Sequence, residues 1–251
     1  MVLKIYISTI FLLLTSPSLT AENQEYKSDS LLAIETLREG INYARDAKYF
    51  KAIKIFNESL FYNQKLYGEN NISTGNVYNV LGITYKNIGD LDNALKYSIK
   101  AEQSFLSDPK TNQIALARIY NNIGNVFKAQ LNHNTALNYY QRAINIFEQQ
   151  DNIDKQGLAD IYYSVAITEF ALNDYNQTLQ IIDKHIENSY SDTKLYFLSL
   201  KAASLKELNR TKDAYQAFQE VIDYAENYFA ENDLDIIFEY INFATFLTDN
   251  N

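Results

Sequence analysis

The chain contains no cysteine and no tryptophan, only two histidines, and few residues that break helices. Without cysteine it has no disulfide, no thiolate metal site and no catalytic thiol, and His133 and His185 alone do not make a typical zinc site. We therefore expect no metal and no cofactor. Seven glycines and two prolines in 251 residues predict long helices joined by short connections.

Positive charge is also scarce. The chain has 22 Lys and Arg against 31 Asp and Glu, a formal net charge of -9. Nucleic acids and anionic lipids bind clustered Lys and Arg, so we expect neither nucleic-acid binding nor direct membrane binding by the mature segment. The sequence has no Gly-rich phosphate loop and no nucleophile elbow. We expect a protein that is not an enzyme and has no catalytic residue.

The first 21 residues have the layout of a secretory signal peptide. A charge at Lys4 precedes an apolar run from Ile5 to Leu14, and Pro17 and small residues follow up to Ala21. The run is about half of the roughly 20 residues that a spanning helix needs, which favours cleavage after Thr20 or Ala21 over an uncleaved anchor. The mature protein is expected in the periplasm or outside the cell.

One pattern of small and large residues recurs along the rest of the chain. Its first small residue, here called the anchor, returns at intervals of 42, 42, 42, 36 and 42 residues: Gly40, Gly82, Gly124, Ala166, Ala202 and Ala244. A second small residue stands twelve positions after the first five anchors: Ala52, Ala94, Ala136, Thr178 and Ala214. Apolar residues around them follow a helical period. Each unit is thus predicted to be a helical hairpin whose small residues let two helices approach closely.

These positions resemble the tetratricopeptide repeat. The likeness is carried most closely by Leu81-Gly82, Tyr85, Gly89, Ala94 and Ala101. The 42-residue spacing, the linker 68–74 and the motif Asn121-Asn122-Ile123-Gly124 are similar to the kinesin light chain variant. The resemblance covers roughly residues 30 to 251 and implies an all-α fold, a right-handed superhelical solenoid of antiparallel helix hairpins.

This resemblance divides the chain into a signal peptide (1–21), an N-terminal lead-in (22–32) and a repeat array (33–251). The array is expected to hold five hairpins and a final half repeat, at about 33–72, 75–114, 117–154, 159–192, 195–228 and 234–247. The fourth repeat is degenerate, with Glu169 where the other repeats have an aromatic residue or Leu. The final helix is apolar on several sides, unlike a polar cap, so we expect an interrupted array that self-associates through it.

In tetratricopeptide proteins a stripe beside the core face of each first helix lines a concave groove. In repeats two and three, the residues of this stripe and the adjacent Asn122 are rich in Asn and include no Asp or Glu. The predicted peptide-binding residues are Asn76, Asn79, Lys86, Arg118, Asn121, Asn122, Asn125 and Lys128, with Ile83 among them. Asn side chains can pair with both groups of a peptide backbone. The alternative is a solvated helix face in an Asn-rich sequence.

Farther along the chain the stripe changes character. Some proteins of the family hold two ligand carboxylates with basic residues, and the last basic pair of such a site would fall at Asp160 and Ser164 in this chain. Because neither residue is basic, we do not expect that ligand specificity here. We interpret the stripe residues of repeats four and five as inter-repeat packing rather than as a ligand pocket: Asp160, Tyr163, Ile167 and Phe170, then Tyr196, Ser199, Ala203 and Lys206. Both histidines are expected to be solvated.

The sequence thus favours a non-catalytic scaffold that acts outside the cytoplasm and holds a protein or peptide in its groove. The alternative is the N-terminal sensory or regulatory region of a longer envelope signalling protein, whose output domain lies beyond Asn251.

Overall fold

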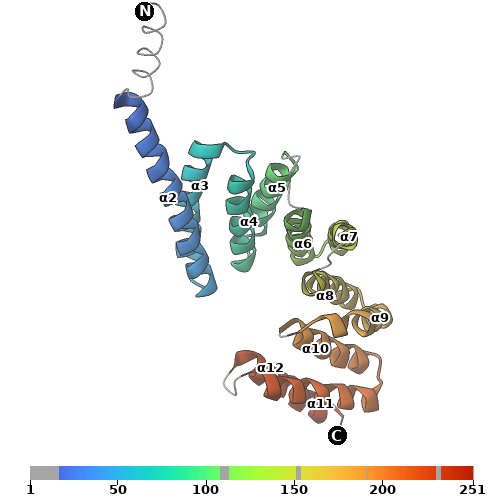
Figure 1. Ribbon diagram of the computed structural model, residues 1–251. Coiled ribbons are helices and arrows are strands. Elements are labelled where there is room, and N and C mark those ends of the chain that lie inside the picture. Colours follow the sequence, from blue (N-terminus) through green and yellow to red (C-terminus); the bar gives the residue numbers. More distant parts are fainter. Residues whose placement is uncertain (1–16, 108–112, 151–153, 191, 230–232, 251) are drawn as a thin grey trace, which may run out of the picture. The chain divides into compact units, whose positions relative to one another are not determined.

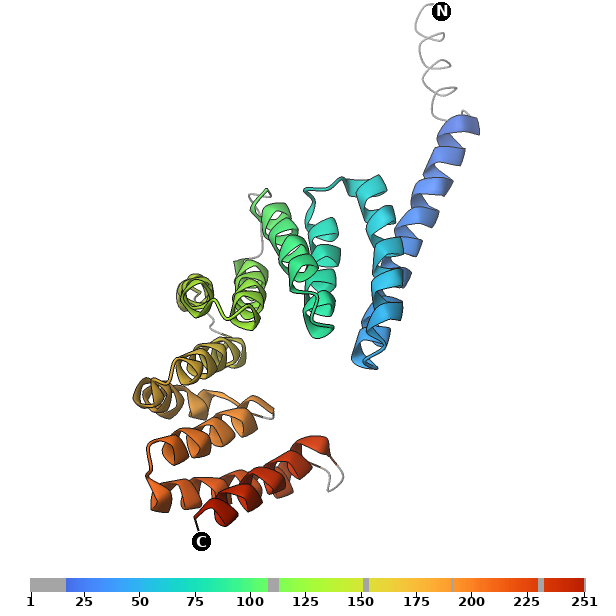
Figure 2. The same ribbon diagram turned by 180° about the vertical axis from the view of Figure 1, so that it is seen from behind.

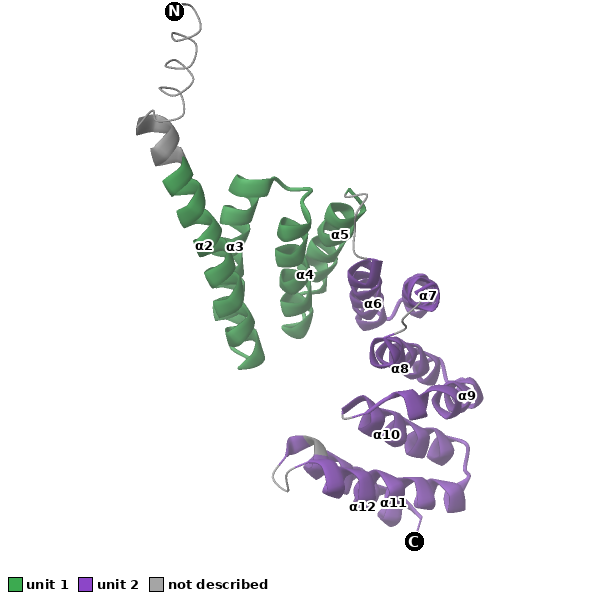
Figure 3. Cartoon of the chain, in the orientation of Figure 1, with its two compact units in different colours: residues 1–112 green, residues 113–251 purple. Residues whose placement is uncertain are grey.

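The computed structural model describes residues 17–107, 113–150, 154–190, 192–229 and 233–250, with side chains from residue 23 onward and without that of residue 235. Most of the predicted signal peptide, residues 1–16, lies outside the described residues. The described chain is helical and contains no strand (Figure 1). It divides into two compact units, residues 1–112 and 113–251, which we describe separately (Figure 3).

The first unit contains two hairpins. Helix α2 (Pro17–Arg45) packs on α3 (Tyr49–Tyr67), and α4 (Ile72–Asn87) packs on α5 (Leu91–Leu106). Contacts between α3 and α4 join the two hairpins. These helices agree with the predicted first and second repeats to within a few residues, except at the start of α2.

The second unit continues the same plan. Helix α6 (Gln113–Ala129) pairs with α7 (His133–Glu148), α8 (Lys155–Ala171) with α9 (Tyr175–His185), and α10 (Asp192–Glu207) with α11 (Thr211–Tyr228). A 3₁₀ helix, η1 (Ile186–Asn188), follows α9, and the final helix α12 (Leu234–Asp249) packs along α11 (Figure 2). The predicted all-α hairpin architecture is confirmed, while the hand of the superhelix stays a prediction.

Helix α2 extends well before the predicted first repeat. It begins at Pro17, a residue that is well tolerated in the first helical turn, so the lead-in 22–32 is helical and continuous with that repeat. Lys65 on α3 pairs with Glu25 at 2.7 Å and with the buried Asp29 at 2.8 Å. These ion pairs attach the extension to α3.

The predicted close contact within a hairpin is present in the second repeat. A Cβ atom added at Gly82 would lie 2.5 Å from Ser98 Oγ and 3.2 Å from the carbonyl oxygen of Ala94. Ala94 itself is completely buried. Neither helix therefore has room for a larger side chain where α4 crosses α5.

In the first and third repeats the anchor glycine serves a different purpose. A Cβ atom at Gly40 would lie 2.5 Å from the ring of Phe56, and one at Gly124 would collide with the ring of Tyr140. Both rings come from the second helix, four residues after its small residue. Here glycine makes room for an aromatic ring, which the sequence pattern did not reveal.

Each hairpin turns at the seventh residue after its anchor, in the left-handed conformation. The five turn residues have φ angles between 55° and 80°: Ala47, Gly89, Leu131, Asn173 and Asn209. At Gly89 the amide bonds to Lys86 O, and the next amide bonds to Tyr85 O, a Schellman motif. The other four turns form the same pair of bonds although they lack glycine. Asn173 and Asn209 adopt this conformation readily, whereas helix packing imposes it on Ala47 and Leu131, which do not favour it.

The fourth repeat is six residues short because its second helix is short. Helix α9 has 11 residues, whereas α5 and α7 each have 16. Its small residue Thr178 is fully buried, and its hydroxyl donates to Asp174 O at 2.9 Å and to Ala166 O at 3.4 Å. The hydrogen bonds satisfy the polar group that replaces alanine here.

His185 is not solvated, contrary to the sequence prediction. Only 9% of its surface is exposed, and its ring stacks on Tyr162 with centroids 3.4 Å apart. Burial, and then Lys184, lower the pKa of His185 to about 4, although Glu148 acts in the opposite direction. The Tyr162 hydroxyl donates to Glu148 at 3.1 Å, so the stack links α7, α8 and α9.

We expect Ala94→Leu and Ala136→Leu to lower the free energy of unfolding by about 1–3 kcal/mol, because each position is fully buried against the facing helix. Thermal or urea denaturation measures the loss. Ala129→Leu is the matched control, since Ala129 is exposed at the end of α6. Equal stability of all three variants would show that the helix contact is not close.

We also expect stability to fall on acidification between about pH 6.5 and pH 4. In this range the unfolded chain binds a proton at His185 that the folded chain does not, so stability is lost as the pH falls. At pH 5 the loss from this group is about 2 kcal/mol. Urea denaturation of His185→Gln should show a shallower pH dependence than the parent protein. Identical pH profiles would contradict the buried neutral histidine.

Candidate ligand-binding faces

The predicted binding residues fall on two helices in different units. Asn76, Asn79 and Lys86 lie on α4 in the first unit, and the other five lie on α6 in the second. The structure therefore presents two amide-rich faces, here called the α4 face and the α6 face, and we analyse each within its own unit.

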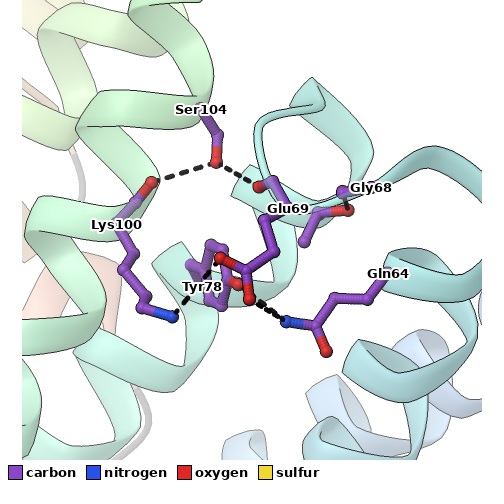
Figure 4. Close-up of polar contacts among 7 residues, drawn as sticks. Gln64, Gly68, Glu69, Tyr78, Lys100 and Ser104 are labelled. Atoms are coloured by element: carbon purple, nitrogen blue, oxygen red, sulfur yellow. Dashed lines mark hydrogen bonds and ion pairs between the residues drawn. The ribbon is translucent and has the colours of Figure 1, made fainter.

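The α4 face lies beside a polar cluster that joins the first two repeats (Figure 4). Gln64 on α3 donates to the Tyr78 hydroxyl at 2.9 Å, and Lys100 on α5 lies 5.1 Å from the centre of the Tyr78 ring. The Ser104 hydroxyl donates to the carbonyl oxygen of Glu69 at 3.0 Å. These contacts hold α3, the linker and both helices of the second repeat together.

On the α4 face itself, Asn76 is exposed while Asn79, Ile83 and Lys86 are partly buried. Burial lowers the pKa of Lys86, so its ammonium group is partly desolvated and is not a simple surface charge. This face combines an exposed amide with a cation that has lost part of its hydration.

On the α6 face, Arg118 is already paired. Its guanidinium donates to Asp154 Oδ2 at 2.9 Å, and Asp154 Oδ1 caps α8 by accepting from the Gly157 amide at 3.0 Å. The stripe contains no acid in the sequence, but an acid 36 residues later reaches it in space. An N-cap residue directly before the next first helix is the only sequence signal for this neighbour.

Asn125 on the α6 face is oriented by a buried tyrosine. The hydroxyl of Tyr140, which is completely buried on α7, donates to Asn125 Oδ1 at 2.9 Å. Burial raises the pKa of Tyr140 far above its usual value, which keeps the hydroxyl protonated as a donor. With its oxygen held inward, Asn125 directs its amide donors away from Tyr140.

Asn121, one helical turn earlier, has an unsatisfied acceptor. Its Oδ1 atom is buried and has no hydrogen-bond partner, although the residue as a whole is only partly buried. A buried acceptor without a partner costs roughly 1–3 kcal/mol. Asn122 and Lys128 are also partly buried on this helix. The α6 face thus offers oriented amide donors beside an acceptor that lacks a partner.

The stripe residues of the later repeats join repeats to one another. The Tyr163 ring on α8 lies 5.7 Å from that of Tyr196 and 5.6 Å from that of Phe197, both on α10. Asp160 accepts from Thr193 at 2.6 Å, across the same pair of helices. These contacts confirm the inter-repeat packing interpretation for Tyr163, Tyr196 and Asp160.

Two further stripe residues of α10 contact the final helix. Ser199 donates to Glu239 at 2.7 Å, and Lys206 pairs with Asp249 at 3.0 Å. Glu239 is 94% buried, and Asn242 also donates to it. The stripe of α10 therefore holds α12 in place.

In the part of the chain that the structure describes, no group of three or more His, Asp and Glu side chains is arranged to hold a metal ion. His133, expected in solvent, is the first residue of α7, and its Nδ1 atom is buried without a hydrogen-bond partner. The prediction that His133 is solvated is therefore wrong for its Nδ1 atom.

Comparison with known proteins agrees with the repeat pattern. Two sequence models described as "Tetratricopeptide repeat" match residues 75–104 and 115–189. No curated protein matches the chain in sequence. Both matched segments contain an anchor glycine and the small residue twelve positions later.

Three solved structures illustrate the shared fold. BtubC (BKLC) from P. vanneervenii is 17% identical, with a TM-score of 0.63 over 84% of this chain and 94% of that chain. A putative kinesin light chain from Podosopora anserina is 9% identical, with a TM-score of 0.63 over 79% of this chain and 96% of that chain.

The apo form of RapI is 13% identical, with a TM-score of 0.68 over 87% of this chain and 84% of that chain. Identities this low show a common fold and no more. The matched sequence models, in agreement with the hairpin repeats, show that the chain contains tetratricopeptide repeats, within residues 75–104 and 115–189.

Proposed function

We propose that this protein is a non-catalytic scaffold that binds a protein or peptide outside the cytoplasm, with the ligand held in the concave groove of the repeats. The observation that carries the proposal is the pair of asparagines on the α6 face. Tyr140 fixes the oxygen of Asn125 inward, and Asn121 beside it has a buried oxygen without a partner.

This pair matches the chemistry of an extended peptide backbone. The Asn125 amide group can donate to a peptide carbonyl, and Asn121 can accept from a peptide N–H. If Asn121 rotated toward the ligand, its buried, unpaired oxygen would gain a hydrogen bond. Ligand binding would therefore remove the unfavourable free energy of an unpaired acceptor in the free protein. The α4 face, with Asn76, Asn79 and Lys86, offers similar groups in the first unit.

The proposed location rests on the layout of residues 1–21. No helix of the described chain is long and apolar enough to cross a membrane. The cleavage site after Thr20 or Ala21 would lie within α2, before the ion pairs that Lys65 makes with Glu25 and Asp29. Cleavage would therefore leave those contacts in place.

A second candidate, the sensory or regulatory region of a longer envelope signalling protein, would use the same faces. It differs in what ligand binding controls, and an output domain encoded after Asn251 would distinguish it. Self-association through α12, predicted from its apolar character, also stays a prediction.

We expect a fusion carrying residues 1–30 ahead of a reporter to be exported and trimmed, so that N-terminal sequencing of the exported product begins at Ala21 or Glu22. The control replaces Leu12, Leu13 and Leu14 with Asp, which should keep the fusion inside the cell. An exported product that retains Met1 would indicate an anchor instead.

We expect the double variant Asn121→Ala, Asn125→Asp to fold but to bind a peptide ligand at least several-fold more weakly. Each lost amide pairing costs about 0.5–1.5 kcal/mol. Asn125→Asp is preferable to Asn125→Ala because the carboxylate still accepts from the buried Tyr140 hydroxyl. Calorimetry with a peptide selected on the parent protein from a displayed random library measures the change.

The matched control is Asn138→Ala, an exposed amide on α7, which should leave affinity unchanged. Lys128→Gln should weaken binding more at low salt than at high salt, because salt screens the attraction between its partly exposed ammonium group and a ligand charge beyond about 10 Å at 0.1 M. Unchanged affinity in the double variant would leave the solvated-face interpretation standing.

A further inference from the structure

Helix α12 leaves uncovered the face that a second helix covers in the other repeats. The anchors Ala166 and Ala202 are completely buried, whereas Ala244, in the same position on α12, is exposed. Ile237 and Tyr240 are 43% and 45% exposed, although their counterparts on α10, Leu195 and Leu198, are buried. Within the described chain this face therefore lacks the helix that its repeat position calls for.

An open cavity adjoins this face. It has a volume of about 410 Å³ and lies between the start of α11 and the end of α12, with Tyr215, Phe246 and Leu247 among its lining residues. One repeat earlier along the chain, Leu179 occupies the position of Tyr215, and Leu205 occupies that of Leu247. Both leucines are buried in the core that includes α11. The cavity is thus where the next second helix would pack.

The segment that carries the uncovered face is acidic in sequence, although Asp213 and Asp249 are paired with Arg210 and Lys206 and Glu239 is buried. Residues 211–251 contain nine Asp and Glu but a single basic residue, Lys212, whereas residues 1–112 contain twelve of each kind. Almost all of the net charge of the protein therefore lies in its last two helices and their linker. Glu226 on α11 accepts a hydrogen bond from Tyr240, which places one acid at the border of the face. Asp223, about one turn earlier on α11, is exposed.

We propose that the uncovered face of α12, together with the cavity beside it, binds a cationic amphipathic helix. The occupant would place a small residue over Ala244, as Ala94 lies against Gly82, and apolar side chains over Ile237 and in the cavity. Its Lys and Arg residues would lie near Asp223 and Glu226. This surface is separate from the α6 face and does not rest on the proposed function.

Charge distinguishes this occupant from a second copy of the chain. Two copies that met through this face would bring two acidic borders together, and like charges at an interface cost affinity. A cationic helix would cover the same apolar surface and gain an electrostatic attraction. A partner of opposite charge is therefore an alternative to the predicted self-association through α12.

The test uses the full chain and two synthetic peptides with the sequence of residues 90–107, which include α5, a second helix of this array. One peptide carries Asp92→Lys and Gln103→Lys, and the other carries Lys96→Glu and Gln103→Glu. These positions are exposed on α5, so both peptides keep the same apolar face. At low salt we expect the cationic peptide to bind at least about ten-fold more tightly, with a smaller ratio at high salt.

Ala244→Phe should abolish this binding by blocking close approach, whereas Thr245→Phe, exposed on the neighbouring side of α12, should preserve it. Circular dichroism checks that both variants fold. Equal affinity for the two peptides, no binding of either, or unchanged binding by Ala244→Phe would overturn the proposal. Sedimentation that shows a dimer abolished by Ala244→Phe would also overturn it, because the occupant would then be a second copy. Asn121→Ala should leave the peptide affinity unchanged.

Discussion

The structure depends on one steric constraint: where the two helices of a hairpin cross, the anchor residue on the first helix has no room for a larger side chain. Gly82 and Ala94 show this most directly, since an added methyl group would collide with the facing helix. The large residues around the crossing, such as Tyr85 stacked on Tyr97 at 5.4 Å, fill the space that the small residues leave. Within each unit, successive hairpins then pack on one another, as α3 packs on α4 in the first unit and α8 on α10 in the second.

The same constraint explains why the fold could be predicted from the sequence. A small residue at a fixed spacing is visible without any knowledge of its partner, so the hairpins were placed to within a few residues. The extension of α2 was missed because the segment before residue 33 contains no anchor. The glycine-to-ring contacts at Phe56 and Tyr140 were missed because spacing shows that a residue is small and does not show what fills the space beside it.

The candidate site was less predictable because its contacts join positions that the repeat pattern does not relate. Asp154 reaches Arg118 from the start of the following repeat, and Tyr140 reaches Asn125 from the partner helix. His185 was expected in solvent. Its burial follows from the shortened α9 and from Tyr162, whose ring covers it. Such contacts depend on the direction in which each side chain points. The period and spacing of a sequence pattern determine that direction only in part.

The two candidate surfaces use different chemistry. The α6 face presents the Asn125 amide, whose orientation is set by the buried Tyr140 hydroxyl, beside the unpaired oxygen of Asn121, which suits recognition of a peptide backbone without strong dependence on its sequence. The uncovered face of α12 presents apolar side chains beside Glu226, which suits a folded helix of opposite charge. A scaffold with both surfaces could hold two partners at once, because each surface lies on a different helix.

The glycine-to-ring contacts also have a consequence for folding. A repeat protein must pair each first helix with its own second helix although several similar helices are present. Gly40 and Gly124 receive rings from Phe56 and Tyr140, whereas Gly82 faces Ser98. If α6 paired with α5, a void would remain over Gly124, and if α4 paired with α7, the ring of Tyr140 would meet a site shaped for serine. Shape complementarity thus distinguishes the second hairpin from the first and third, which disfavours mispairing between them during folding.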